Sequence, residues 1–106
     1  MLVGLKDPSA LDVADRALKL KPDTAYVLGT TGWAAFHAGK ADRALQLLRD
    51  ARLRDPSHAG IRYYLGSVLA QQGRKGEARE ELEAAVRLGA GTVYAQDASA
   101  LLKTVN

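Results

Sequence analysis

The side chains that most often do chemistry in proteins are few in this sequence and far apart. His37 and His58 are its two histidines, it has no cysteine, and neither histidine has clustered carboxylates beside it. A metal ion needs several ligands that converge, and the sequence offers no such set. The serines fall at predicted helix caps or on helix surfaces, where no serine–histidine–aspartate arrangement forms. We therefore expect no catalytic residue, no metal site and no cofactor.

Aromatic side chains form a second group, suited to binding. They are Tyr26, Trp33, Phe36, Tyr63, Tyr64 and Tyr94. Aromatic residues that face solvent are common anchors of protein–protein interfaces. Phe36 and Tyr63 can equally be explained as packing residues, so both interpretations stay open for these two.

The composition favours helices as the elements that position these side chains. Alanine and leucine dominate the apolar residues, whereas the β-branched and aromatic residues that favour strands are sparse. No apolar run approaches the roughly 20 residues that cross a bilayer, so we expect no direct membrane insertion. The net charge is +3, with 15 basic residues interspersed among 12 acidic ones, so nucleic-acid binding is not expected either.

The sequence repeats itself at a spacing of 34 residues. This shift superposes prolines, glycines and alanines: Pro22 on Pro56, Gly32 on Gly66, Gly39 on Gly73, Ala44 on Ala78 and Ala51 on Ala85. Gly32 and Gly66 fall inside predicted helices, where glycine costs about 1 kcal/mol relative to alanine, so we interpret them as points of close approach between helices. Gly39 and Gly73 fall where helices should end. The pattern predicts six antiparallel helices joined by short turns, at 8–20, 24–38, 41–54, 58–72, 75–88 and 93–104.

This pattern resembles the tetratricopeptide repeat (TPR), whose motif is W-x2-L-G-x2-Y, then A-x3-F, then P. At these positions the first repeat has Leu28, Thr31, Gly32, Ala35, Ala44, Leu48 and Pro56. The second repeat has Arg62, Leu65, Gly66, Leu69, Ala78 and Leu82, with Ala90 where proline is usual. Thr31 and Arg62 are the clear departures. The resemblance implies an all-α, right-handed helical solenoid of about six antiparallel helices. It would comprise a half repeat (7–22), two full repeats (23–56 and 57–90) and a capping helix (91–106).

The same resemblance implies a non-catalytic scaffold whose first helices line a concave groove for a peptide or partner protein. The groove residues would be Tyr26, Thr30, Trp33, Phe36, His37, Tyr63, Tyr64, Ser67 and Tyr94, with Asp97 and Leu101 added by the capping helix. Some TPR domains hold a C-terminal carboxylate with groove lysines and asparagines. This stripe lacks them, so we do not expect acidic-tail ligands.

The segment from Arg62 to Lys103 is also similar to the C-terminal end of TPR lipoproteins of bacterial exosortase (PEP-CTERM) systems. Those proteins are associated with envelope protein sorting and exopolysaccharide production. This second resemblance implies an alternative function, a structural or self-assembly module. The parent protein would then be periplasmic or envelope-associated, and otherwise cytoplasmic.

The N-terminal half repeat lacks the first helix of its pair, which suggests a fragment of a longer array. Leu11, Leu18 and Leu20 would normally face a preceding helix or the next pair, so part of this surface would then be open. Burying such leucines is favourable, so we expect a weak homodimer through this edge unless Met1 to Leu5 fold back to cover it.

Overall fold

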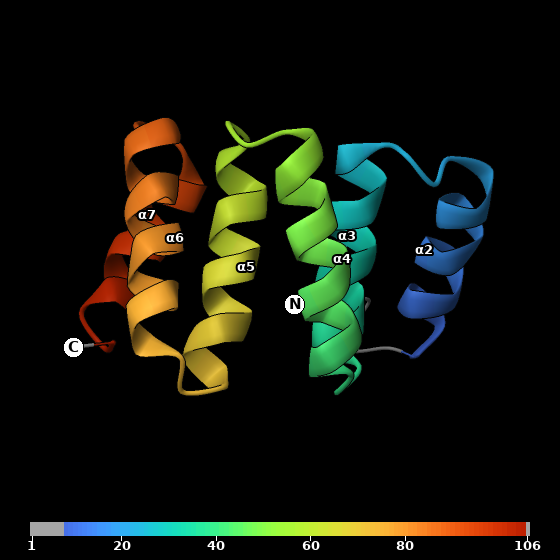
Figure 1. Ribbon diagram of the computed structural model, residues 1–106, viewed down its shortest axis with the longest axis horizontal. Helices are drawn as coiled ribbons and strands as arrows, with labels where there is room; N and C mark the ends of the chain where they lie inside the picture. The colour runs from blue at the N-terminus through green and yellow to red at the C-terminus, as the bar shows by residue number, and fades with distance from the viewer. Residues whose placement is uncertain (1–7, 106) are drawn as a thin grey trace. The chain divides into compact units, whose positions relative to one another are not determined.

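Residues 8–105 are described by a computed structural model, in which they form six helices and no strand. The helices are α2 (Pro8–Leu20), α3 (Ala25–His37), α4 (Ala41–Arg54), α5 (Ala59–Gln71), α6 (Lys75–Leu88) and α7 (Val93–Leu102) (Figure 1). The expected all-α fold is confirmed. Every predicted helix begins and ends within two residues of an observed helix.

The chain divides after Arg54 into two compact units, each with its own helix packing. In the first unit, α3 packs against both α2 and α4. In the second, α6 packs against both α5 and α7, and α5 also contacts α7. The helices of the pairs α3–α4 and α5–α6 run antiparallel, as their short connections require (Figure 1).

A glycine turn produces each of these antiparallel pairs. Beyond α3, Gly39 has a φ of 81°, and its N–H donates to the carbonyl oxygen of Phe36 at 3.1 Å. The N–H of Lys40 donates to the carbonyl oxygen of Ala35 at 2.9 Å. The same pair of bonds recurs around Gly73, whose φ is 80°. Glycine adopts this left-handed backbone without strain, so the predicted capping role of both glycines is confirmed.

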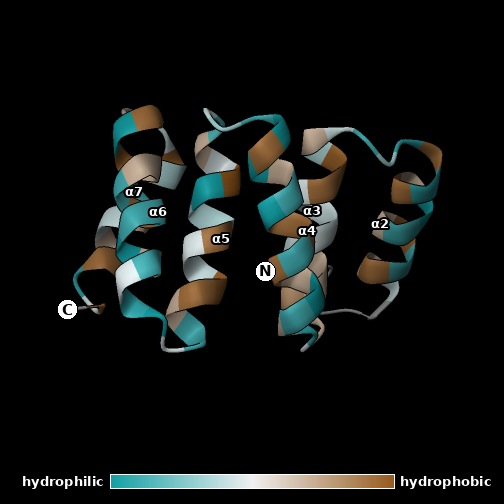
Figure 2. Cartoon of the chain, viewed as in Figure 1, coloured by the Kyte–Doolittle hydropathy of each residue, from teal (hydrophilic) through white to brown (hydrophobic). Residues whose placement is uncertain are grey.

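Two further glycines let the paired helices come close. A Cβ at position 32 would lie 2.7 Å from Cγ of Leu48 on α4, and a Cβ at position 66 would lie 2.7 Å from Cγ of Leu82 on α6. The repeated alanines of the facing helices are fully buried: Ala44, Ala51, Ala78 and Ala85. The side of α6 that Figure 2 displays is mainly hydrophilic. The predicted close approach is therefore confirmed.

The two departures from the repeat motif make polar contacts between helices. Thr31 is fully buried, and its Oγ1 donates to the carbonyl oxygen of Ala14 on α2 at 3.2 Å. Nη1 of Arg62 lies 3.0 Å from Oε1 of Glu81 on α6, and Nε of Arg62 donates to the carbonyl oxygen of Pro56 at 2.9 Å. Polar contacts thus link the helices at positions where the motif has apolar residues.

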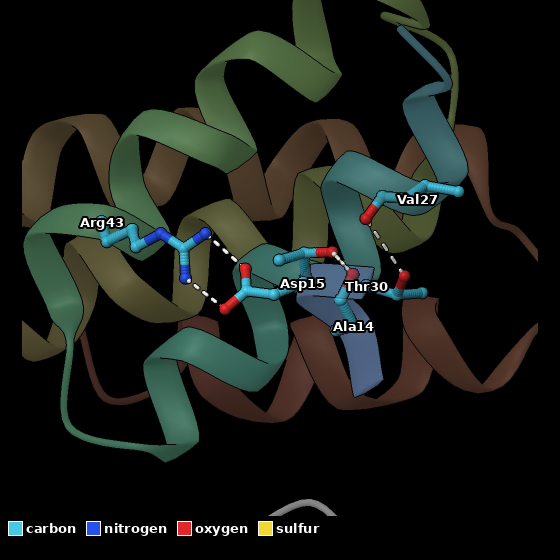
Figure 3. Close-up of polar contacts among 6 residues, drawn as sticks. Ala14, Asp15, Val27, Thr30 and Arg43 are labelled. Atoms are coloured by element: carbon cyan, nitrogen blue, oxygen red, sulfur yellow. Dashed lines mark hydrogen bonds and ion pairs between the residues drawn. The ribbon is translucent and has the colours of Figure 1, made fainter. Parts of the chain in front are cut away.

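An ion pair links α2 to α4. Nη1 of Arg43 donates to Oδ2 of Asp15 at 3.2 Å, and Nη2 donates to Oδ1 of the same carboxylate (Figure 3). The hydrogen bond to Asp15 is the main cause that raises the pKa of Arg43. Desolvation opposes this effect and the charge of Asp15 adds to it. Because the two side chains are 39% and 32% exposed, the pair contributes about 1 kcal/mol or less.

Helix α2 exposes part of its apolar surface. Val13 is 62% exposed and Leu20 is 83% exposed, and the two lie two turns apart on one face. Leu11, on the same helix, is buried, at 7% exposed. The reason is that Leu11 shares the face of Ala14, whose carbonyl oxygen meets α3. The alternative to a dimer, in which Met1 to Leu5 fold back over this edge, concerns residues outside those described.

Candidate functional site

Helix α3 carries a group of three contacting rings, which we call the α3 ring cluster: Trp33, Phe36 and His37. The ring centroid of Trp33 lies 5.5 Å from that of Phe36 and 4.5 Å from that of His37. Phe36 and His37 are 5.5 Å apart. Positions three and four residues apart meet on a helix surface, which is why local sequence alone assembles this cluster. All three side chains are partly exposed, so a ligand can reach them.

Tyr26 and Thr30 extend this face towards the start of α3, at positions two turns and one turn before Trp33. Tyr26 is 67% exposed, the most of the six aromatic side chains. Oγ1 of Thr30 donates within its own helix, to the carbonyl oxygen of Tyr26 at 3.1 Å. Its second acceptor is the carbonyl oxygen of Val27 at 3.2 Å (Figure 3). Since that hydroxyl hydrogen is shared between two backbone acceptors, Thr30 offers a ligand mainly its methyl group and an acceptor oxygen.

The second unit holds a tyrosine cluster, formed by Tyr63 and Tyr64 of α5 and Tyr94 of α7. Their ring centroids are 5.9 Å apart for Tyr63 and Tyr64, 6.4 Å for Tyr63 and Tyr94, and 6.0 Å for Tyr64 and Tyr94. Gly60 makes room for this arrangement, because a Cβ there would lie 3.0 Å from Cζ of Tyr94. Each tyrosine is partly exposed.

Tyr63 lies between the core of the second unit and its surface. It packs against the core residues of the second unit, Leu82, Ala85, Ala98 and Val105. It also lines a hollow of about 430 Å³ together with Asp97, Ala100, Leu101 and Thr104. Thr104 reaches this hollow because α7 ends at Leu102 and the chain turns back, with the N–H of Thr104 donating to the carbonyl oxygen of Leu101 at 2.9 Å.

Ser67 lies apart from the accessible surface. It is 9% exposed, and its Oγ donates to the carbonyl oxygen of Tyr63 at 2.8 Å. Ser67 was predicted on the binding stripe, but its hydroxyl bonds within α5. Ser67 therefore offers a ligand little surface.

The two histidines have separate structural settings. His37 belongs to the α3 ring cluster, whereas Nδ1 of His58 accepts a hydrogen bond from the N–H of Ile61 at 3.2 Å and caps α5. Across residues 8–105, histidines and carboxylates nowhere gather in threes that could hold a metal ion. No helix within the same range has the length and apolar character needed to cross a membrane.

Comparison with known proteins gives a family match and structural relatives. Residues 8–52 and 30–92 match the family described as tetratricopeptide repeat. The type III secretion translocator chaperone SycD of Yersinia enterocolitica is similar, with 19% identity, a TM-score of 0.80, and coverage of 92% of this chain and 70% of SycD. No curated protein matches the sequence.

Two further relatives are complexes. PcrH with the chaperone binding region of PopD has 21% identity and a TM-score of 0.79, over 92% of this chain and 76% of PcrH. The second TPR domain of human RPAP3 with the HSP70 peptide SGPTIEEVD has 20% identity and a TM-score of 0.77, over 91% of this chain and 78% of that domain. At such identities the likeness shows a shared fold.

Proposed function

The chain belongs to the tetratricopeptide-repeat family, and on this premise we propose that it is a non-catalytic scaffold that binds a peptide or a partner protein. The observation that carries the proposal is the accessible ring surface of α3, where Tyr26 is 67% exposed and the α3 ring cluster is partly exposed. Aromatic rings have few rotatable bonds, so ordering them on binding costs little entropy. Rings that are already held in place by neighbouring rings lose still less conformational entropy when a ligand binds.

The related complexes support a peptide as the ligand. PcrH is bound to a region of PopD, and the RPAP3 domain is bound to a peptide of HSP70. An extended segment lying along α3 would meet Tyr26, Thr30, Trp33 and His37 in turn. The HSP70 peptide ends in acidic residues, whereas the predicted groove here lacks lysine and asparagine. We therefore propose a ligand other than an acidic C-terminal tail.

Trp33 provides the test, because it is the single tryptophan. Peptides would be selected from a random library on the immobilised chain, and their affinities measured by calorimetry. We expect binding to shift the fluorescence of Trp33. Trp33→Ala should weaken binding by about 2 kcal/mol, roughly 30-fold. The control is Leu53→Ala on α4, a side chain that is 75% exposed and outside the proposed surface.

The affinities of the two variants decide the outcome. Loss of affinity in Trp33→Ala with wild-type affinity in Leu53→Ala supports the proposed surface. Equal affinities of wild type and Trp33→Ala would contradict it. If Tyr64→Ala alone then weakened binding, the ligand would bind the tyrosine cluster instead.

A second candidate function is self-assembly through α2, which Val13 and Leu20 favour because both are largely exposed. Burying one such side chain contributes about 1.5–3 kcal/mol, and an isologous dimer would bury both side chains of each protomer. Sedimentation over a wide concentration range should show dimers that Leu20→Glu abolishes. A wild-type chain that stays monomeric throughout would exclude this candidate.

A more specific version of the self-assembly function places the module in an envelope protein-sorting or exopolysaccharide system. It rests on the resemblance of residues 62–103 to exosortase-system lipoproteins. Fractionation of cells that produce the full parent protein tests it, since an envelope-associated parent is expected and a wholly cytoplasmic one would contradict it.

A further inference from the structure

The hollow beside Tyr63 has the chemistry of a cation site. Its lining residues are Tyr63, Asp97, Ala100, Leu101 and Thr104, so Asp97 supplies the one formal charge among them. Asp97 is exposed, and among residues 8–105 no hydrogen bond or ion pair engages its carboxylate. A carboxylate at the rim of an apolar hollow is free to pair with a basic group from a ligand.

The end of α7 adds to this negative potential. The helix ends at Leu102, close to the hollow-lining residues Leu101 and Thr104. The carbonyl groups of its last turn point towards this C-terminal end, where the helix dipole favours cations. Both the N–H and the Oγ1 of Thr104 donate to the carbonyl oxygen of Leu101, at 2.9 and 2.7 Å. The other carbonyl groups of the last turn keep acceptor capacity.

The ring of Tyr63 favours the same kind of ligand. The face of an aromatic ring attracts a lysine or arginine head group, and arginine also stacks on it. Ala100 and Leu101 offer an apolar surface for the aliphatic stem of such a side chain. Nη2 of Arg79 donates to the carbonyl oxygen of Val105, the residue after Thr104, at 3.0 Å, so this part of the guanidinium is engaged with the backbone.

We propose that this hollow of the second unit binds a lysine or arginine side chain of a peptide ligand. The head group pairs with Asp97 and lies on Tyr63, and the stem packs on Ala100 and Leu101. This inference rests on the proposed peptide-binding function and specifies the ligand's chemistry. It gives the scaffold a preference for basic segments.

The test uses defined probes that require no partner protein. N-acetyl-arginine methylamide and Nα-acetyl-lysine methylamide are titrated into the full chain, and N-acetyl-norleucine methylamide serves as the probe with an uncharged stem. Backbone and tyrosine-ring NMR signals are followed. We expect saturable shifts at Tyr63, Asp97 and Leu101 with the basic probes, and none that saturate with the norleucine probe.

Two variants with the same change of charge separate the subsite from general electrostatics. Asp97→Asn should reduce the affinity for the arginine probe by about fivefold or more, because the charge-assisted hydrogen bond is lost. Glu83→Gln, an exposed carboxylate on α6, should leave its affinity unchanged. The amide spectrum of each variant verifies its fold.

The proposal is overturned if the basic probes give no saturable shifts, if the norleucine probe binds equally well, or if Asp97→Asn binds arginine like the wild type. Failure here is distinguishable from failure of the scaffold function. If the selected peptides lose affinity in Trp33→Ala but bind Asp97→Asn like the wild type, the scaffold function is supported and the basic subsite is contradicted.

Discussion

Replacing Gly66 with alanine should destabilise the protein, although alanine is the better helix former. The new Cβ would lie 2.7 Å from both Cγ and Cδ2 of Leu82, and 3.4 Å from the carbonyl oxygen of Ala78. Carbon atoms in good contact are about 3.5–4.0 Å apart, so one helix must move or Leu82 must change its rotamer. Leu82 is fully buried, so any movement of its side chain must displace neighbouring core atoms.

Two opposing effects set the magnitude. Glycine to alanine in a helix interior gains about 1 kcal/mol in helix propensity. Overpacking of a well-packed core costs about 1–3 kcal/mol, and a contact with the branch carbon of a buried leucine favours the upper part of that range. We expect a net loss of about 1–2 kcal/mol, which corresponds to a fall in Tm of roughly 5–10 °C for a chain of this size.

Gly76 supplies the matched control in the same unit. It lies in the first turn of α6, and a Cβ there would have no neighbouring atom within 4 Å. Gly76→Ala should therefore gain up to about 1 kcal/mol. Thermal and urea unfolding followed by circular dichroism measures both variants, and their stabilities should change in opposite directions.

A double-mutant cycle tests the proposed cause. In a Leu82→Ala background the added methyl group has no leucine to meet, so Gly66→Ala should become neutral or stabilising. A stabilising Gly66→Ala in the wild-type background would refute the reasoning. The same cost with and without Leu82 would show that the contact with Leu82 is not its source.

Two further predictions concern the polar departures from the repeat motif. Thr31→Val keeps the shape but removes the hydrogen bond to Ala14, so it should cost about 1 kcal/mol and speed amide hydrogen exchange in α2, while Thr31→Ser should largely preserve protection. Arg62→Met should cost about 2 kcal/mol in urea unfolding, because the Glu81 side chain is only 8% exposed and loses its guanidinium contact. The double variant Arg62→Met with Glu81→Met should recover most of that loss, and no recovery would contradict a role for the ion pair.

The helices themselves could be predicted from the sequence, because their signals are local. Gly39 and Gly73 end helices through their own backbone conformation, and the turn residues near Pro22 and Pro56 separate the repeats. The α3 ring cluster was predictable for the same reason, since its residues are neighbours on one helix face.

Contacts between helices required the tertiary structure. The sequence marked Thr31 and Arg62 as departures from the motif, yet it gave no sign that their partners are Ala14 and Glu81. The burial of Ser67 was equally hidden, because periodicity gives the face of a residue but not how far a neighbouring helix covers it.

The candidate cation site likewise combines features that the sequence predicted with one that only the tertiary structure revealed. Helical register, together with the resemblance to the tetratricopeptide repeat, predicted one common surface for Tyr63, Asp97 and Leu101. Their meeting with Thr104 around a hollow depended on where α7 ends and how it lies against α5. Local periodicity determines which residues share a helix face, whereas packing between segments distant in sequence decides which of those faces meet and which stay open.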